Sequence, residues 1–126
     1  MNIRSNVEQL VELVEQGNLL EAFERFYAED VAMRENTNPP TVGKAANRQR
    51  EIEFVNSVRE VHQSRAAFVA VDGDRAVIGW ELEFTNKDGQ RLRLDQVAVQ
   101  TWQDGRIVDE RFVYDSGSVV VEPVAA

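Results

Sequence analysis

The chain has 126 residues and contains no cysteine and only one histidine. Without cysteine it can form neither a disulfide scaffold nor a zinc ribbon, and it has no cysteine nucleophile. Basic residues are also scarce, since 14 Lys and Arg stand against 22 Asp and Glu, for a formal net charge of −8. A nucleic-acid binder needs basic residues to neutralise phosphates, so this balance excludes that class.

Long apolar runs are missing as well. No run approaches the ~18 residues of a membrane span, and the opening residues MNIRS lead into a charged helix rather than a signal peptide. Neither a repeat nor a low-complexity tract interrupts the sequence. We therefore expect one globular, cytoplasmic domain over residues 1–126, without a membrane or nucleic-acid partner. A chain of this length buries roughly two-thirds of its unfolded surface.

The first half of the sequence has the periodicity of helices. The first helix is expected to bury Val7, Leu10, Val11 and Val14. The second, after Gly17-Asn18, is expected to bury Leu19, Ala22, Phe23 and Phe26. A third is predicted over residues of about 43–58, with Ala46, Ile52 and Val55 inward. Its charged residues, Arg48, Arg50 and Glu51, are predicted to point outward.

From Val61 onward the apolar period changes to two, which is typical of strands. Turn signals at residues 72–74, 86–89 and 104–105 divide this half into four strands, and a short earlier strand is expected at residues 31–33. Three helices followed by an antiparallel meander predict an α+β fold, with the helices on one side of the sheet.

The turns also predict strand register. With Gly89 in the left-handed conformation, Phe84 pairs with Leu92 and Trp80 with Gln96, which brings apolar residues together. For the last hairpin, a two-residue turn followed by an uninterrupted ladder places Arg111 and Asp115 on the helix-covered face. Charges on a covered face must be paired, solvated or lining a cavity, because burying them bare costs several kcal/mol.

The opposite face of the predicted sheet mixes charges with an apolar patch. The patch consists of Val97, Val99, Phe112 and Tyr114, and we expect a homodimer to form through it. Glu81 and Asp95 face each other on the same side. Like charges directly opposite are destabilising, so we expect a cation nearby, from Arg65 or from a partner subunit.

Residues 26–33 (FYAEDVAM) after two helices, and residues 104–115 (DGRIVDERFVYD) as the last hairpin, resemble the nuclear transport factor 2-like superfamily. Within it, the chain is most similar to SnoaL-like domains. The resemblance covers essentially the whole chain. It implies a cystatin-like, cone-shaped α+β fold, with a strongly curved antiparallel sheet packed on three N-terminal helices. The superfamily includes polyketide cyclases, ketosteroid isomerase, epoxide hydrolases, dehydratases and members that only bind or associate.

Two carboxyl groups correspond to catalytic positions of these relatives. Asp115 resembles the acid/base Asp on the last strand of SnoaL-like cyclases. Glu35 falls, counting from residues 29–30, at the proton-shuttling carboxylate of ketosteroid isomerase. The oxyanion-hole residues of that isomerase would fall near Leu10 and Ala98, which donate no side-chain hydrogen bond, so steroid isomerisation is not expected.

The candidate catalytic residues are Glu35, His62, Arg111 and Asp115. Glu35 or Asp115 would carry a proton, His62 would assist, and Arg111 would stabilise negative charge. Each could also be structural, as a solvated carboxylate, a hydrogen-bonded strand residue or an ion pair. Two registers are possible across the turn at residues 72–74, odd and even, and they place His62 on opposite faces of the sheet. In the even register Ala66 pairs with Trp80 and His62 points inward; the sequence leaves the choice open. The candidate ligand wall, equally consistent with plain core, is Met33, Phe54, Trp80, Phe84, Gln96 and Val113.

Two classes of function remain. The first is a small-molecule protein, with acid/base isomerase, cyclase or lyase chemistry on an apolar or amphipathic ligand that bears a carbonyl group. No cofactor or metal is implied, since one histidine and scattered carboxylates lack ligand spacing. The second is a non-enzymatic dimeric ligand carrier or association domain. Water addition to an epoxide would need a second inward Asp beside Asp115, and none is evident.

Overall fold

A computed structural model describes residues 2–118 and 120–123 of the chain. The helices are α1 (Arg4–Glu15), α2 (Leu19–Phe26), α3 (Lys44–Ser57) and the short 3-10 helix η1 (Ser116–Ser118). The strands are β1 (Tyr27–Glu35), β2 (Thr41–Val42), β3 (Val58–Asp72), β4 (Arg75–Asn86), β5 (Gln90–Gln103), β6 (Arg106–Val113) and β7 (Val120–Pro123). No helix of the described residues is long and apolar enough to span a membrane.

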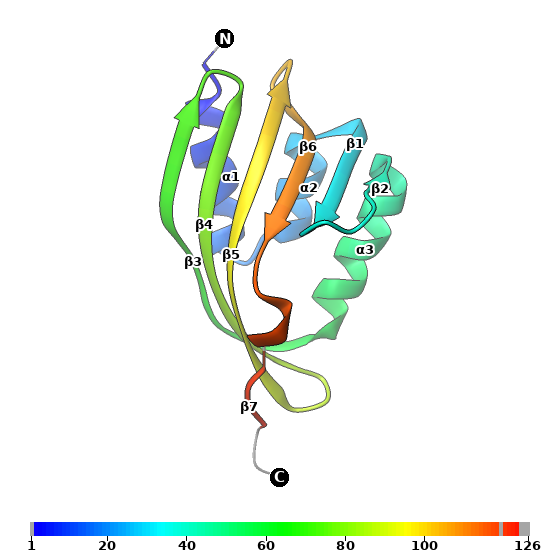
Figure 1. Cartoon of the computed structure of the whole chain (residues 1–126), viewed down its shortest axis with the longest axis vertical. Helices are drawn as coiled ribbons and strands as arrows, with labels where there is room; N and C mark the ends of the chain where they lie inside the picture. The colour runs from blue at the N-terminus through cyan, green and yellow to red at the C-terminus, as the bar shows by residue number, and fades with distance from the viewer. Residues whose placement is uncertain (1, 119, 124–126) are drawn as a thin grey trace.

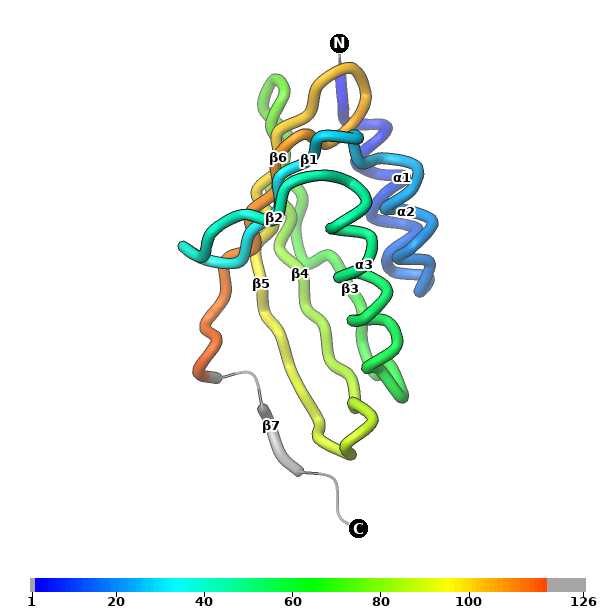
Figure 2. The backbone as a smooth tube through the Cα atoms, turned by 90° about the vertical axis from the view of Figure 1, so that its right-hand side faces the viewer, coloured from blue at the N-terminus to red at the C-terminus, as the bar shows by residue number. Residues whose placement is uncertain are grey.

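The strands form one curved sheet, and α1, α2 and α3 lie on one of its faces (Figures 1 and 2). The strand order is β2-β1-β6-β5-β4-β3, with β7 paired to β5. The α+β prediction is thus confirmed. The expected antiparallel sheet is mixed instead, because β1 pairs with β6 in parallel. After β1, the chain passes through β2 and α3 to the opposite edge of the sheet, where β3 lies. Strands β3 to β6 then lead back across the sheet, and β6 lies beside β1 and runs in the same direction.

The predicted register between β4 and β5 is confirmed. Phe84 pairs with Leu92 and Trp80 with Gln96, and Gly89 has the expected positive φ of 81°. A left-handed residue at this position suits glycine because it has no Cβ. The turn residues therefore set which side chains of these strands reach the helices.

The two acidic residues that face each other are also present. Glu81 pairs with Asp95, and Arg65 Nε lies 3.1 Å from a carboxylate oxygen of Glu81, so the expected cation comes from β3 of the same chain. Arg93 lies 3.2 Å from Asp95 and provides a second cation. The like-charge pair is thus balanced within one subunit.

The register between β5 and β6 differs from the prediction. Val108 forms a bulge without a partner on β5, so that beyond it Ala98 pairs with Phe112 rather than with Arg111, and Arg111 pairs with Val99. One extra residue exchanges the two faces of a strand. The bulge therefore turns Glu110 and Phe112 toward the helices and sends Arg111 to the open face.

Helix α3 is rotated relative to the predicted orientation. Lys44 and Asn47 are buried, whereas Ala46 and Val55 are exposed. The inward stripe is Lys44, Asn47, Glu51 and Phe54. Asn47 Nδ2 lies within hydrogen-bonding distance of three backbone oxygens at the β1–β2 connection, and Lys44 Nζ donates to a backbone oxygen of α2 at 2.8 Å. These contacts hold Lys44 and Asn47 on the inner side, so polar groups rather than the apolar pattern accompany the orientation of the helix.

Candidate functional site

The inner face of the sheet contains a buried carboxyl group, that of Glu110, which is 1% exposed. The Tyr27 hydroxyl donates a short hydrogen bond to its Oε1. Gln100 Nε2 donates to its Oε2 at 2.7 Å, and Trp102 Nε1 donates to Gln100 Oε1 at 3.0 Å. Strands β1, β5 and β6 thus contribute to one buried network in which both carboxylate oxygens accept a hydrogen bond.

Local sequence features assemble this network. Gln100 and Trp102 are two residues apart on β5, so both point to the inner face. Glu110 reaches the same face because of the bulge at Val108. Tyr27 is the first residue of β1, where its ring stacks on Phe23 of α2 at a centroid distance of 4.8 Å. The aromatic stack holds the hydroxyl group at the level of Glu110.

Burial raises the pKa of Glu110 to about 7. The hydrogen bonds from Tyr27 and Gln100 act in the opposite direction, because they stabilise the charged form, and the nearby carboxyl group of Glu51 raises the pKa further. The pKa of Tyr27 is well above its ordinary value, first through burial and then through Glu110, so Tyr27 keeps its proton and remains a donor.

A second interior carboxyl group belongs to Glu51 on α3. Its side chain is half-buried, and it makes no hydrogen bond or ion pair within the part of the chain that the structure describes. Burial raises its pKa to about 7, with a further contribution from the Glu35 carboxylate and an opposing one from Arg50. A carboxyl group with this pKa exchanges protons near neutral pH, as a general acid or base must.

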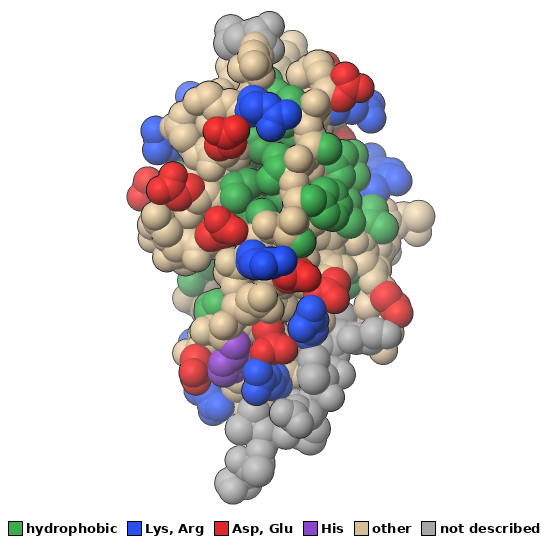
Figure 3. Space-filling model, turned by 90° about the vertical axis from the view of Figure 1, so that its left-hand side faces the viewer, with side chains coloured by type: hydrophobic (Ala, Val, Ile, Leu, Met, Phe, Trp, Pro, Cys, Tyr) green, Lys and Arg blue, Asp and Glu red, His purple; other side chains and the backbone are tan. Residues whose placement is uncertain are grey.

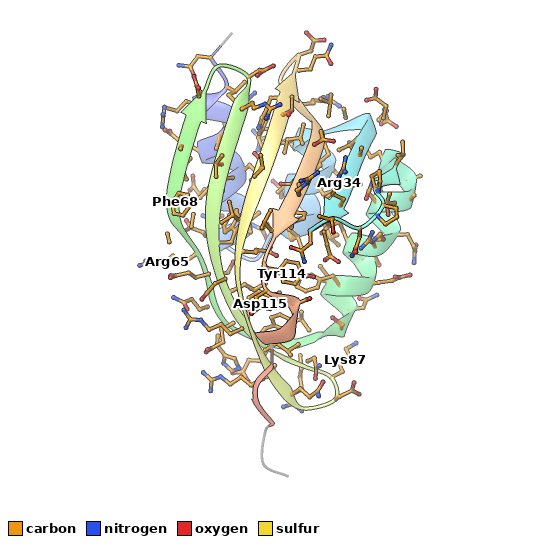
Figure 4. The ribbon with its side chains drawn as sticks, in the orientation of Figure 1. Arg34, Arg65, Phe68, Lys87, Tyr114 and Asp115 are labelled. Carbon is orange, nitrogen blue, oxygen red and sulfur yellow. The ribbon has the colours of Figure 1, made fainter. Side chains whose placement is uncertain are left out.

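Four interacting side chains, Glu35, Thr41, Arg50 and Tyr114, form a polar group that we call the rim, and two of them, Glu35 and Arg50, act on the charge of Glu51. Glu35, at the end of β1, lies 3.8 Å from Arg50 of α3, and Arg50 Nη1 donates to Thr41 Oγ1 at 2.7 Å. Burial raises the pKa of Tyr114, as do the charge of Glu35 and a hydrogen bond to it. Tyr114 follows β6 directly (Figure 4). Polar groups therefore extend from the rim through Glu51 to the buried network, an arrangement suited to moving a proton.

Comparison with known proteins identifies the family of the chain. The family model of the SnoaL-like domain matches residues 1–114. The chain belongs to the SnoaL-like domain family. This match confirms the resemblance noted in the sequence, and the matched segment includes the rim and the buried network.

Several solved structures are similar to this SnoaL-like domain. A candidate SnoaL-like polyketide cyclase from Mesorhizobium loti is 30% identical, with a TM-score of 0.77 over 89% of this chain and 98% of that chain. A candidate polyketide cyclase from Xanthomonas campestris pv. campestris is 25% identical, with a TM-score of 0.76 over 90% of each chain. A Xanthomonas campestris protein of unknown function with a cystatin-like fold shares the fold, with a TM-score of 0.80, 19% identity and coverages of 94% and 95%. No curated protein matches the chain.

Two of the predicted catalytic residues of this SnoaL-like domain lie outside the site. Arg111 is exposed on the open face of the sheet, because the bulge at Val108 exchanges the faces of β6. Asp115 is exposed after the end of β6, where its Oδ1 accepts a hydrogen bond from the Gly117 backbone at 3.0 Å (Figure 4). The predicted inward positions of both residues are wrong for the same reason, a missed bulge. Glu35 does lie at the rim of the site, and its catalytic role stays a prediction.

His62 takes neither of the two positions that the sequence left open. It lies in a bulge of β3, and its Nε2 is 2.7 Å from Oγ1 of the buried Thr85. Ala66 does pair with Trp80, as in the even register, but a further bulge follows directly. His62 lies among charged side chains on the surface near the lower end of the molecule (Figure 3). This placement separates it from the Glu110 network.

The predicted ligand wall is mostly on the inner face. Met33, Trp80 and Phe84 are buried, and the half-buried Phe54 contacts Phe84 edge-on at a centroid distance of 5.5 Å. Gln96 pairs with Trp80 and shares its face. Val113 is the exception, since it is 46% exposed on the open face. That these side chains contact a ligand stays a prediction.

Four residues of the site were not predicted from the sequence: Tyr27, Glu51, Gln100 and Glu110. A signal existed for Gln100, because a polar residue alternates there with Ala98 and Trp102 on the inner face. No such signal existed for Glu110, whose position depends on the bulge. Among the described residues, no group of three or more His, Asp or Glu side chains could hold a metal ion.

The raised pKa of Glu110 makes stability depend on pH. The carboxyl group titrates at 4.5 when unfolded and at about 7 when folded, so its contribution to stability is full below pH 4.5 and is lost as the pH rises through 7. Glu110→Gln can accept a hydrogen bond from Gln100 and donate one to the Tyr27 oxygen. We expect the stability of this variant relative to wild type to increase by about 3 kcal/mol between pH 4.5 and pH 8.

Urea unfolding at both pH values measures this difference. Glu53→Gln, at an exposed position of α3, is the control for the loss of one negative charge. A difference between Glu110→Gln and wild type that is the same at both pH values would show that Glu110 does not titrate abnormally.

Proposed function

We propose that this SnoaL-like domain binds a small apolar or amphipathic ligand with a carbonyl group and catalyses proton transfer on it, as an isomerase, cyclase or lyase. Glu51 is the proposed general acid and base. The observation that carries the proposal is the Glu51 carboxyl group, half-buried beside the Glu110 network, without a hydrogen-bond partner in the described residues and with a pKa of about 7. Such a group matches the requirements of acid/base catalysis near neutral pH.

In the proposed step, the Glu51 carboxylate removes a proton from the carbon next to the carbonyl group. The electron pair of the broken C–H bond moves to the carbonyl oxygen and gives an enolate. The proton then returns from Glu51 to carbon or to oxygen, so that the step needs no cofactor. An apolar wall that includes Met33 and Phe84 favours this chemistry, because a low dielectric strengthens each electrostatic contact.

The rim is proposed to orient the polar end of the ligand. Arg50 is about half exposed, and its contact with Glu35 at 3.8 Å is loose, so that its guanidinium group can also bind a carbonyl or enolate oxygen. The Tyr114 hydroxyl is a further donor at the same rim, and its raised pKa keeps it protonated. Arg50 thus takes the role that the sequence suggested for Arg111.

The second candidate, a non-enzymatic carrier or association domain, also has a specific observation in its favour. Every buried side-chain nitrogen and oxygen of the described residues has a hydrogen-bond partner. Phe23, Trp80 and Phe84 are buried on the inner side of the sheet. The interior polar groups are therefore satisfied without a ligand, as an association domain requires.

Exchange of carbon-bound hydrogen for deuterium separates the two candidates. A panel of apolar cyclic ketones that includes 2-tetralone is incubated with the protein in D₂O, and loss of the proton next to the carbonyl group is followed by NMR. We expect faster exchange than in buffer, and a loss of about 100-fold or more in Glu51→Gln, because the proton acceptor is removed.

Glu53→Gln on the same helix is the matched control and should exchange as fast as wild type, since Glu53 is exposed. Equal rates for Glu51→Gln and wild type would contradict the role of Glu51. Exchange no faster than in buffer across the whole panel would favour the non-enzymatic candidate.

We also propose a homodimer that forms through the open face of the sheet. Phe112 and Tyr114, expected in the interface, lie on the inner side because of the β6 bulge. The proposed patch instead consists of Phe68, Val77, Val97, Val99 and Val113. Phe68 is 51% exposed, and its ring lies where a side chain at Gly79 would be, so that it covers the sheet backbone. Apolar side chains gather in the upper half of the molecule, with charged side chains around and below them (Figure 3).

Charge in the middle of the patch should disrupt the dimer. We expect the wild-type protein to sediment with twice the mass of one chain and Val99→Asp to sediment as a monomer, because a carboxylate would be buried unpaired. Val42→Asp is the control, since Val42 is 64% exposed on β2 at the other edge of the sheet. A wild-type protein that sediments as a monomer, or a Val99→Asp dimer, would contradict this interface.

A further inference from the structure

The hydrogen bonds around Glu110 have a direction that Trp102 determines. An indole N–H can only donate, so the oxygen of the Gln100 amide must face Trp102, at 3.0 Å. The NH₂ group of the same amide is then directed to Glu110 Oε2, at 2.7 Å. The orientation of this amide follows from the chemistry of the indole, since the reverse orientation would bring two donors together.

This direction works against protonation of Glu110. A proton on Oε2 would meet the NH₂ group of Gln100, which can only donate, and a proton on Oε1 requires the Tyr27 hydroxyl, which donates to that oxygen, to turn and accept instead. Each carboxylate oxygen therefore faces a donor, and protonation either breaks the hydrogen bond from Gln100 or reverses the one from Tyr27. Hydrogen bonds to a charged group are about twice as strong as neutral ones, so the arrangement favours the carboxylate although the site is buried.

We propose that Trp102 is a positioning residue that acts through Gln100 to hold Glu110 as the acceptor of two hydrogen bonds. The groups that face Glu110 are Tyr27 from β1, Gln100 from β5 and Glu51 from α3, with Asp109 adjacent on β6. None of them is a cation, so the fixed amide and the hydroxyl are what stabilise its charge.

The role of these hydrogen bonds in catalysis rests on the proposed function. A negative charge held on Glu110 makes it harder for Glu51 to lose its own proton, since two nearby carboxylates repel each other. Glu51, which is half-buried and makes no hydrogen bond in the described residues, is then the group that exchanges its proton with a ligand, and Glu110 is the hydrogen-bonded carboxyl group behind it. Two carboxyl groups with different environments thereby take different roles.

The wild-type protein provides the first test. In ¹⁵N-labelled protein, the indole resonance of Trp102 should shift with the same midpoint as the carboxyl carbon of Glu110, because the Gln100 amide connects the two groups. Trp80 is an internal control, since its indole makes no hydrogen bond within the described part of the chain. A Trp102 indole resonance that does not move through the Glu110 titration would overturn the proposal.

Substitution provides the second test. In Trp102→Phe the Gln100 amide is free to turn its oxygen to Glu110 and accept its proton, so we expect the Glu110 midpoint to rise by about 1 pH unit. Trp80→Phe removes the same volume from the same face of the sheet and should leave the midpoint unchanged. A folded Trp102→Phe protein with the wild-type midpoint would show that Trp102 only fills space.

If Trp102→Phe does not fold, the variant Gln100→Met and the wild-type indole titration together test the positioning role of Trp102. This variant keeps Trp102 and removes the donor to Glu110, so the midpoint should again rise by about 1 unit; an unchanged midpoint would overturn the proposal. The ketone exchange assay keeps the two claims apart. A shifted midpoint without exchange activity in any protein would remove the proposed function and leave the positioning role intact. Exchange activity of the wild-type protein together with an unshifted Glu110 midpoint in the variants would remove the positioning role and leave the proposed function intact.

Discussion

A carboxyl group buried without a cation is the constraint on which the interior of this protein depends. Removing the Glu110 carboxylate from water is costly, and no arginine, lysine or histidine pairs with it in the described part of the chain. The cost is offset by donors from two other strands, Tyr27 on β1 and Gln100 on β5. Removal of either donor would leave a buried oxygen without a partner.

Two local departures from regular structure create this interior. The bulge at Val108 turns Glu110 inward, and the polar contacts of Asn47 rotate α3 so that Glu51 points toward the same region. With a regular β6, Asp109 would lie opposite Gln100 in place of Glu110, and Arg111 would lie opposite Ala98 in place of Phe112. The charge of the interior is thus determined by one additional residue in a strand and by the hydrogen-bond requirements of one turn, rather than by composition.

These departures also separate what the sequence could predict from what it could not. Gly89 needs a left-handed conformation, and this requirement set the β4–β5 register and the Glu81–Asp95 pair, for which Arg65 was expected and found. The three helices, the α+β class and the family resemblance followed from periodicity and turn residues in the same way.

The candidate site was less predictable. A bulge leaves no mark in an alternating pattern, so Arg111 was assigned to the wrong face. Apolar periodicity likewise predicted that Glu51 points outward, because it does not account for the hydrogen bonds of the Lys44 and Asn47 side chains to backbone oxygens. Gln100, which regular alternation places on the inner face, could therefore have been predicted, whereas Glu110 and Glu51 could not.

Two glutamate carboxyl groups, the buried Glu110 and the half-buried Glu51, have raised pKa values and influence each other. Carboxyl-carbon NMR of ¹³C-glutamate-labelled protein, titrated from pH 3 to pH 9, tests this claim most directly, with Glu51→Gln and Glu110→Gln assigning the two resonances. We predict that both midpoints lie near 7 and that Glu51→Gln lowers the midpoint of Glu110. Midpoints of about 4 to 5 for every glutamate, as in model peptides, would contradict this picture of the interior.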